Sequence, residues 1–83
     1  MRITVRASGL LVRYLPENAR GKEAELEVAE GATPAQVIAQ LGMPAEGRYL
    51  VIRNGTAVPR AERDTLALSE GDTLAIVPPL KGG

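Results

Sequence analysis

The first residues of the chain alternate between apolar and polar side chains, the pattern of a β-strand with one buried face. Residues 2–7 alternate apolar residues with arginine or threonine, and residues 24–29 repeat the pattern with Glu25 and Glu27 on the polar face. Because successive side chains of a strand point to opposite faces, each segment is expected to bury one face. If the two strands pair antiparallel, their outward arginines and glutamates lie opposite one another.

The main helix is expected to begin at Pro34 and to end near Gly42. Thr33 can cap the free N–H groups of the first turn, Pro34 suits the first helical position, and Gln36 completes a capping box. Gly42 suits the left-handed residue that terminates a helix. The apolar stripe of this helix consists of Val37, Ile38 and Leu41.

The remaining pattern predicts one short helical turn and two or three further strands. Residues 10–15 have helical spacing and stop before Pro16. Residues 48–53 form an apolar run typical of a well-buried strand, and Asn54-Gly55 is the preferred hairpin turn into residues 56–58. The last features are a polar loop at 59–65, core positions at Leu66 and Leu68, a turn at 70–72 and a final strand at 73–77.

This order of elements predicts an α+β fold, a mixed sheet with one main helix packed on one face. Residues 1–77 are expected to form the domain. Residues 78–83 follow the last strand directly as an extended tail, because Pro78 and Pro79 cannot join a sheet ladder. Six extended residues reach at most about 20 Å.

Composition narrows the chemistry that the chain can perform. The 83 residues contain ten basic and ten acidic side chains, with no cysteine, histidine or tryptophan. This excludes disulfides, thiol nucleophiles, Ser-His-Asp triads and cysteine or histidine metal sites. The balanced charge gives no reason to expect nucleic acid or membrane as a partner. No apolar run resembles a signal peptide, so we expect a cytoplasmic protein. Because no metal-ligand set or catalytic residue set is present in the sequence, we also expect that the chain binds no metal and is not itself an enzyme.

The acidic residues are expected to lie mostly in solvated turns and not in a paired acid–base site. These residues are Glu17, Glu23, Glu30, Glu46, Glu62, Asp64, Glu70 and Asp72. Arg60 and Arg63 combine with Glu62 and Asp64 in a mixed cluster that is expected to be a surface.

The segment Pro78-Pro79-Leu80-Lys81-Gly82-Gly83 has two interpretations. It can be a frayed terminus without a role, since chain ends are commonly poorly ordered. Alternatively it is a substrate, because glycines without a Cβ can thread a narrow channel and present the Gly83 carboxylate to another enzyme. ATP would convert that carboxylate to an acyl-adenylate, and a sulfur nucleophile that replaced AMP would leave a thiocarboxylate. No other group in the chain offers comparable chemistry.

Residues 70–83 combine a Glu-Gly-Asp turn, a last strand, a Pro-Pro pair and a terminal Gly-Gly. With residues 12–15, 30–34 and 52–60, they resemble the ubiquitin-like sulfur carriers. That family includes the small subunit of molybdopterin synthase and the sulfur carrier of thiamine thiazole synthesis. The resemblance covers essentially the whole chain, and the tail is its specific part.

The resemblance implies a β-grasp fold and partners that act on the tail. A ubiquitin-activating-type enzyme would adenylate Gly83 with ATP, a persulfide donor would supply sulfur, and an acceptor enzyme would receive it. The chain itself would bind no cofactor, and residues 78–82 would thread the partner's channel. Arg13 would help to dock the activating enzyme, although a solvated arginine explains it equally well. Val77 stands on the partner-facing surface, where molybdopterin-type members often have phenylalanine.

The final sulfur acceptor remains open at the level of sequence. The tail and the long segment 8–23 favour a molybdopterin-type carrier slightly, with the large subunit of molybdopterin synthase as acceptor, whereas residues 54–60 favour a thiamine-type carrier. Two alternatives share the fold. The chain can be a protein modifier that is conjugated through Gly83 to lysines, or a non-catalytic binding module with an inert tail.

Overall fold

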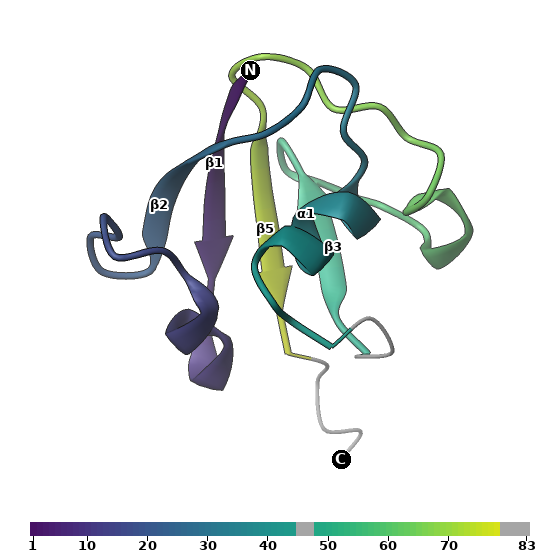
Figure 1. The fold of residues 1–83 in the computed structure, drawn as a ribbon. Helices are drawn as coiled ribbons and strands as arrows, with labels where there is room; N and C mark the ends of the chain where they lie inside the picture. The colour runs from purple at the N-terminus through teal and green to yellow at the C-terminus, as the bar shows by residue number, and fades with distance from the viewer. Residues whose placement is uncertain (45–47, 79–83) are drawn as a thin grey trace.

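The computed structural model describes residues 1–44 and 48–78, which form five strands, one α-helix and two 3₁₀-helices. Figure 1 shows α1 lying across one face of the sheet. The predictions for Glu46, Pro79, Leu80, Lys81, Gly82 and Gly83 lie outside the described residues. In chain order the elements are β1 (Arg2–Ala7), η1 (Gly9–Tyr14), β2 (Glu23–Glu27), α1 (Pro34–Gln40), β3 (Leu50–Arg53), β4 (Thr56–Ala57), η2 (Arg60–Glu62) and β5 (Thr73–Val77).

The strands form one mixed sheet in the order β2-β1-β5-β3-β4. β5 runs parallel to β1 on one side and antiparallel to β3 on the other. β1 pairs antiparallel with β2, and β3 pairs antiparallel with β4. The last strand of the chain is therefore central, with a pair of strands on each side. This is the predicted α+β architecture, a β-grasp fold.

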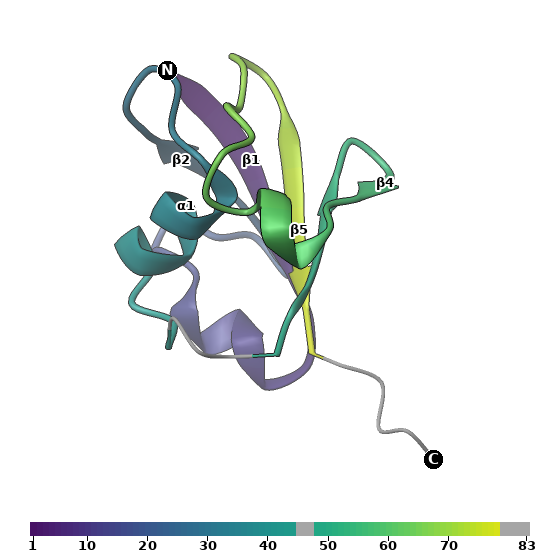
Figure 2. The ribbon, with the colours of Figure 1, turned by 90° about the vertical axis from the view of Figure 1, so that its right-hand side faces the viewer.

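The core lies between α1 and the sheet, and Figure 2 shows the helix on one side of the sheet. One face of each long strand supplies it, because side chains alternate across the pleat. Burial of each aliphatic side chain contributes about 1.5–3 kcal/mol, so a small set of residues accounts for most of the stability. The most completely buried side chains are Ile3, Val5, Pro34, Val37, Val51, Leu74 and Ile76.

The helix begins and ends where the sequence predicts. Thr33 Oγ1 accepts a hydrogen bond from the Gln36 backbone N–H, and Gln36 Oε1 accepts one from the Thr33 N–H, which completes the capping box. At the other end, Gly42 has φ +81° and donates its N–H to the carbonyl of Ala39. Local interactions therefore define both ends of α1, a side-chain cap at the start and a left-handed glycine at the end.

The hairpin prediction is confirmed, and two other predictions need adjustment. Asn54 and Gly55 have φ values of +49° and +86°, the signature of the turn that matches strand twist. The second strand covers Glu23–Glu27, where residues 24–29 were predicted. The predicted loop at 59–65 contains η2, whose single turn ends when Arg63 donates its N–H to the Arg60 carbonyl. A three-residue turn leaves no periodicity in sequence.

Candidate functional site

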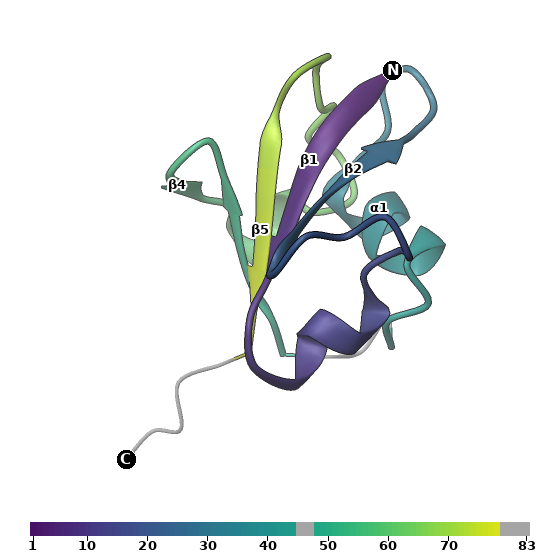
Figure 3. The ribbon, with the colours of Figure 1, turned by 90° about the vertical axis from the view of Figure 1, so that its left-hand side faces the viewer.

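The tail begins at the end of the central strand. Val77 is the last residue of β5 and lies opposite Leu50 of β3, whereas Ile76 lies opposite Ala7 of β1. Pro78 follows and is exposed. Because β5 is paired on both sides up to this end, the sheet fixes the point from which the tail leaves. Figure 3 shows η1 at the same end of the sheet.

Arg13, the predicted docking arginine, belongs to η1. Its side chain is exposed, and its guanidinium carbon lies 5.7 Å from the centre of the Tyr14 ring. A cation at this distance from an aromatic face is attracted to it without being covered. η1 packs against the ends of β1 and β5, so Arg13 and Val77 lie on elements that meet at the base of the tail.

An apolar patch lies on the sheet face opposite α1. Cross-strand partners point to the same face, so the pairs Val77–Leu50, Ala75–Ile52 and Ile52–Ala57 define it. Leu50 is 45% exposed and Ala57 is exposed, while the other members are half-buried. We call this the outer apolar patch, and its members are Leu50, Ile52, Ala57, Ala75 and Val77.

The outer apolar patch corrects the prediction that residues 48–53 form a well-buried strand. Val51 and Tyr49 are buried against the core, but Leu50 and Ile52 point to the opposite face. The sheet carries α1 on one face only, so half of an apolar strand in this position must face outward. The sequence alone did not show this, because the uninterrupted apolar run at residues 50–52 is also the pattern of a strand that is covered on both faces.

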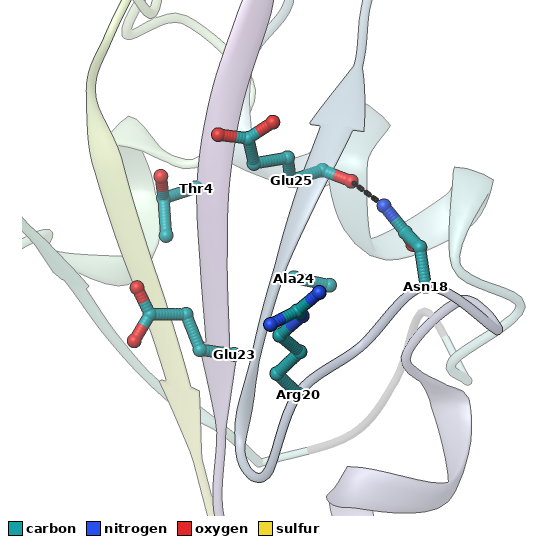
Figure 4. Close-up of a pocket in the computed structure, with 6 residues that line it drawn as sticks. All are labelled: Thr4, Asn18, Arg20, Glu23, Ala24 and Glu25. Atoms are coloured by element: carbon teal, nitrogen blue, oxygen red, sulfur yellow. Dashed lines mark hydrogen bonds between the residues drawn. The ribbon is translucent and has the colours of Figure 1, made fainter.

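The other half of the same sheet face is charged and pairs its own charges, as predicted. Arg2 lies 3.7 Å from both Glu25 and Glu27, and Arg6 stands opposite Glu23. A groove of about 590 Å³ opens along β2 here, lined by Thr4, Asn18, Arg20, Glu23, Ala24 and Glu25. Figure 4 shows Asn18 reaching the Glu25 carbonyl, which it contacts at 3.3 Å. The groove thus lies along the edge strand β2, and its exposed charged side chains include both arginine and glutamate.

Asp72, predicted among the solvated turn carboxylates, is instead buried with 7% of its surface exposed. Its carboxylate accepts hydrogen bonds from Arg53 Nε at 2.9 Å, Asn54 Nδ2 at 3.0 Å and the Ser69 N–H at 2.8 Å. Asn54 Oδ1 in turn accepts a bond from the Thr73 N–H at 2.8 Å. The carboxylate therefore joins the β3–β4 turn to the start of β5, and its role is structural.

The ionisation of Asp72 reflects this network. Burial alone would raise the pKa of Asp72, but the hydrogen bonds from Asn54, Ser69 and Arg53, with the charge of Arg53, outweigh it and lower the pKa. Asp72 is therefore held as a carboxylate that fixes the first residue of the strand leading to the tail.

Arg63 also departs from the predicted surface cluster. Its guanidinium is partly buried and donates a hydrogen bond to the Tyr49 carbonyl, so it ties the η2 segment to the strand β3. Burial lowers the pKa of Arg63, and the charge of Arg60 lowers it further. Arg60, Glu62 and Asp64 remain exposed, as predicted.

Residues 1–44 and 48–78 contain no group of three acidic side chains placed to hold a metal ion. Within these ranges no helix has both the length and the apolar character needed to cross a membrane. The candidate site therefore consists of the base of the tail, the outer apolar patch beside it and Arg13 on η1.

Comparison with solved structures identifies the fold. SAMP1 (small archaeal modifier protein 1) of Haloferax volcanii superposes over the full length of both chains, with a TM-score of 0.65 and 25% identity. Urm1 of Trypanosoma brucei matches over 99% of this chain and 95% of its own, with a TM-score of 0.67 and 17% identity. A complex of subunits 1 and 2 of the molybdopterin-converting factor of Helicobacter pylori contains a match over the full length of both chains, with a TM-score of 0.63 and 16% identity.

Comparison with curated sequences finds no match. A family model, however, matches residues 12–83, from the end of η1 through β5 and the tail to Gly83. The match therefore includes most of the domain and all of residues 78–83. The chain belongs to the ThiS family.

Proposed function

We propose that this chain is a sulfur carrier whose working group is the carboxylate of Gly83. The observation that carries the proposal is the Gly82-Gly83 pair, which follows the central strand of a ThiS-family domain after only four intervening residues. Fully extended, residues 78–83 span at most about 20 Å, which is enough to reach into another enzyme while the domain stays on its surface.

Sulfur is loaded onto the carrier in three steps. A Gly83 carboxylate oxygen attacks the α-phosphorus of ATP on a ubiquitin-activating-type enzyme and displaces pyrophosphate. The terminal sulfur of a persulfide donor then attacks the acyl carbon and displaces AMP, which leaves an acyl disulfide. A thiolate finally attacks the donor's sulfur, so that a new disulfide leaves with the donor and Gly83 keeps a thiocarboxylate. An acceptor enzyme of cofactor biosynthesis uses that sulfur, with a molybdopterin-type acceptor slightly favoured.

The outer apolar patch is the surface on which we place the partner enzymes. Leu50 is large, apolar and 45% exposed, and its direct neighbour Val77 is the last residue before the tail. A partner that covers this patch removes apolar surface from water and receives the tail at the edge of the same contact. Arg13 adds a cation at the same end of the domain, where an acidic group of the partner can pair with it.

Leu50→Glu is expected to weaken binding to the activating enzyme about 10-fold or more, because a central apolar contact becomes a charge that must lose water. The free energy of unfolding should change by only about 0.5 kcal/mol, since the side chain is exposed in the free protein. Isothermal titration with the activating enzyme measures the first quantity, and urea unfolding the second.

Ala61→Glu is the matched control, because it adds the same charge to an exposed residue of η2 that is not a member of the outer apolar patch. It should bind as the unchanged protein does. Equal weakening by both variants would show that the added charge, and not the patch, is responsible.

The function itself is tested by the mass of the protein after reaction. A chain ending at Gly83 is incubated with a ubiquitin-activating-type enzyme, ATP, a persulfide donor and a thiol. We expect a fraction of the intact protein to gain the mass difference between sulfur and oxygen, only when ATP is present. If no activating enzyme of this type supports pyrophosphate exchange or sulfur gain with this chain, the proposed function is wrong.

A second candidate function is protein modification, favoured by the 25% identity to SAMP1, a protein named as a modifier. The same adenylate would then be attacked by a lysine Nζ, with AMP as the leaving group and an isopeptide bond as the product. Lysine-linked conjugates that depend on Gly83 would establish it. The chain has only two lysines, Lys22 and Lys81, so Lys22→Arg removes the one outside the tail that could accept a second copy.

A further inference from the structure

Gly9 is the first residue of η1 and lies against the base of the tail. Its φ of +59° falls in the left-handed region, which glycine adopts without steric cost. A Cβ placed on Gly9 would lie 3.1 Å from Cγ and 3.9 Å from Cδ of Pro78. Pro78 therefore lies close to Gly9, and a Cβ at this position would require the proline ring to shift by a few tenths of an ångström.

This close approach separates Gly9 from the other described glycines with positive φ. Gly21, Gly31, Gly42, Gly55 and Gly71 share the conformation, but each would place a Cβ in open space. Their glycine is explained by the turn alone. At Gly9 a second requirement exists, and the atoms that impose it belong to the first residue after β5.

The contact acts where the direction of the tail is set. Val77 is held by its pairing with Leu50, so Pro78 is the first residue that the sheet does not hold. The proline ring already fixes its own φ near −65°. A ring seated on the Gly9 backbone also loses freedom to rotate about the preceding bonds, so the chain leaves the domain in a narrower range of directions.

We propose that Gly9 is a positioning residue for the reaction at Gly83, because it forms the seat for Pro78 that aims the tail. The proposal rests on the proposed function. Five residues beyond Pro78 reach roughly 17 Å, so a tilt of about 10° at the base moves the far end by about 3 Å. Misplacement of reacting groups by about 1 Å can cost on the order of 100-fold in rate, so the seat contributes to the turnover of the activating enzyme.

The test compares Gly9→Val with Gly21→Val. Gly21 has φ +63° and open space around it, so both variants carry the same strain and only Gly9→Val displaces Pro78. With the carrier as varied substrate, we expect Gly9→Val to lower kcat for pyrophosphate exchange about 10-fold, less than the limit for misplaced groups because the enzyme's channel also guides the tail. KM should stay unchanged, because the outer apolar patch is intact. Gly21→Val should change neither.

A second measurement examines the seat without any enzyme. Nuclear Overhauser contacts between the Gly9 Hα atoms and the Pro78 ring are expected in the unchanged protein and in Gly21→Val, and are expected to be lost in Gly9→Val. If Gly9→Val does not fold, Gly9→Ala, which requires Pro78 to shift by only a few tenths of an ångström, takes its place. The double variant Gly9→Ala/Pro78→Ala removes the clashing ring atoms and should show a coupling between the two sites.

Two outcomes would overturn the proposal. The first is that Gly9→Val loses the Gly9–Pro78 contact but has the same kcat as Gly21→Val. The second is that the contact is absent in the unchanged protein. Failure of the unchanged protein to support any exchange is a different result. It removes the proposed function and, with it, the positioning role, while the Overhauser contacts still show whether the seat exists.

Discussion

For a chain that lacks Gly83, the rate of ATP-dependent sulfur loading is expected to fall by at least about 100-fold. The new carboxylate, on Gly82, falls short of the adenylating centre by roughly 3.5 Å, the length of one extended residue, and such a misplacement removes most of the benefit of a bound, aligned reactant. Addition of one alanine after Gly83 should have a comparable effect, because it moves the carboxylate past the centre and places a Cβ beside it. Pyrophosphate exchange with the activating enzyme measures both variants.

The affinity of the chain without Gly83 for the activating enzyme distinguishes a misplaced carboxylate from a general loss of binding. The outer apolar patch is unchanged, so the affinity for the activating enzyme should stay within a few-fold of that of the full chain. Lys22→Arg, a substitution in an exposed turn, should retain full activity. Loading that survives removal of Gly83 would place the chemistry elsewhere and would contradict the proposed function.

Asp72→Ala is expected to destabilise the domain by about 2–3 kcal/mol, because three partly buried hydrogen bonds, from Ser69, Asn54 and Arg53, lose their acceptor. For a domain of this size the loss corresponds to a fall in Tm of roughly 10–20 °C. Thermal unfolding followed by circular dichroism measures it. Glu70→Ala is a suitable comparison, because Glu70 is exposed and its carboxylate accepts one hydrogen bond from the Arg2 N–H. An equal loss in both variants would contradict a special role for the buried carboxylate.

The lowered pKa of Asp72 gives the same network a pH dependence. In the unfolded chain Asp72 titrates near about 3.9, above its value in the folded protein. Its contribution to stability is therefore complete above about pH 4 and is lost as the pH falls from there through the folded pKa. Asp72→Asn cannot titrate, so the difference in free energy of unfolding between the two proteins should shrink below about pH 4. A difference that is constant with pH would contradict this account.

Much of the fold was predictable because its signals are local. The capping box of Thr33 and Gln36 fixes the start of α1 through hydrogen bonds that span three residues. The Asn54-Gly55 turn selects its own backbone conformation. The alternation in residues 2–7 sets the buried face of β1 whatever it pairs with, since the pleat alone places alternate side chains on opposite faces. Each feature depends on neighbouring residues only.

The errors concern residues whose environment depends on distant parts of the chain. The Glu-Gly-Asp turn gave no local sign that Asp72 is buried, because its partners Arg53 and Asn54 belong to the β3–β4 hairpin, far away in the sequence. Leu50 was expected inside, because hydrophobicity does not show whether a sheet is covered on one face or on two. Arg63 was assigned to the surface, although packing of η2 brings it to the Tyr49 carbonyl.

The candidate site divides in the same way. The sequence alone determined where the proposed reactive group lies, since the proposal rests on the Gly82-Gly83 pair after two prolines and on the absence of histidine and cysteine. Only the tertiary structure decided what surrounds the base of that tail. The parallel pairing of β1 with β5 brings Gly9 beneath Pro78, and the antiparallel pairing of β3 places Leu50 beside Val77. These contacts join residues far apart in the chain, so they exist only once the sheet has formed.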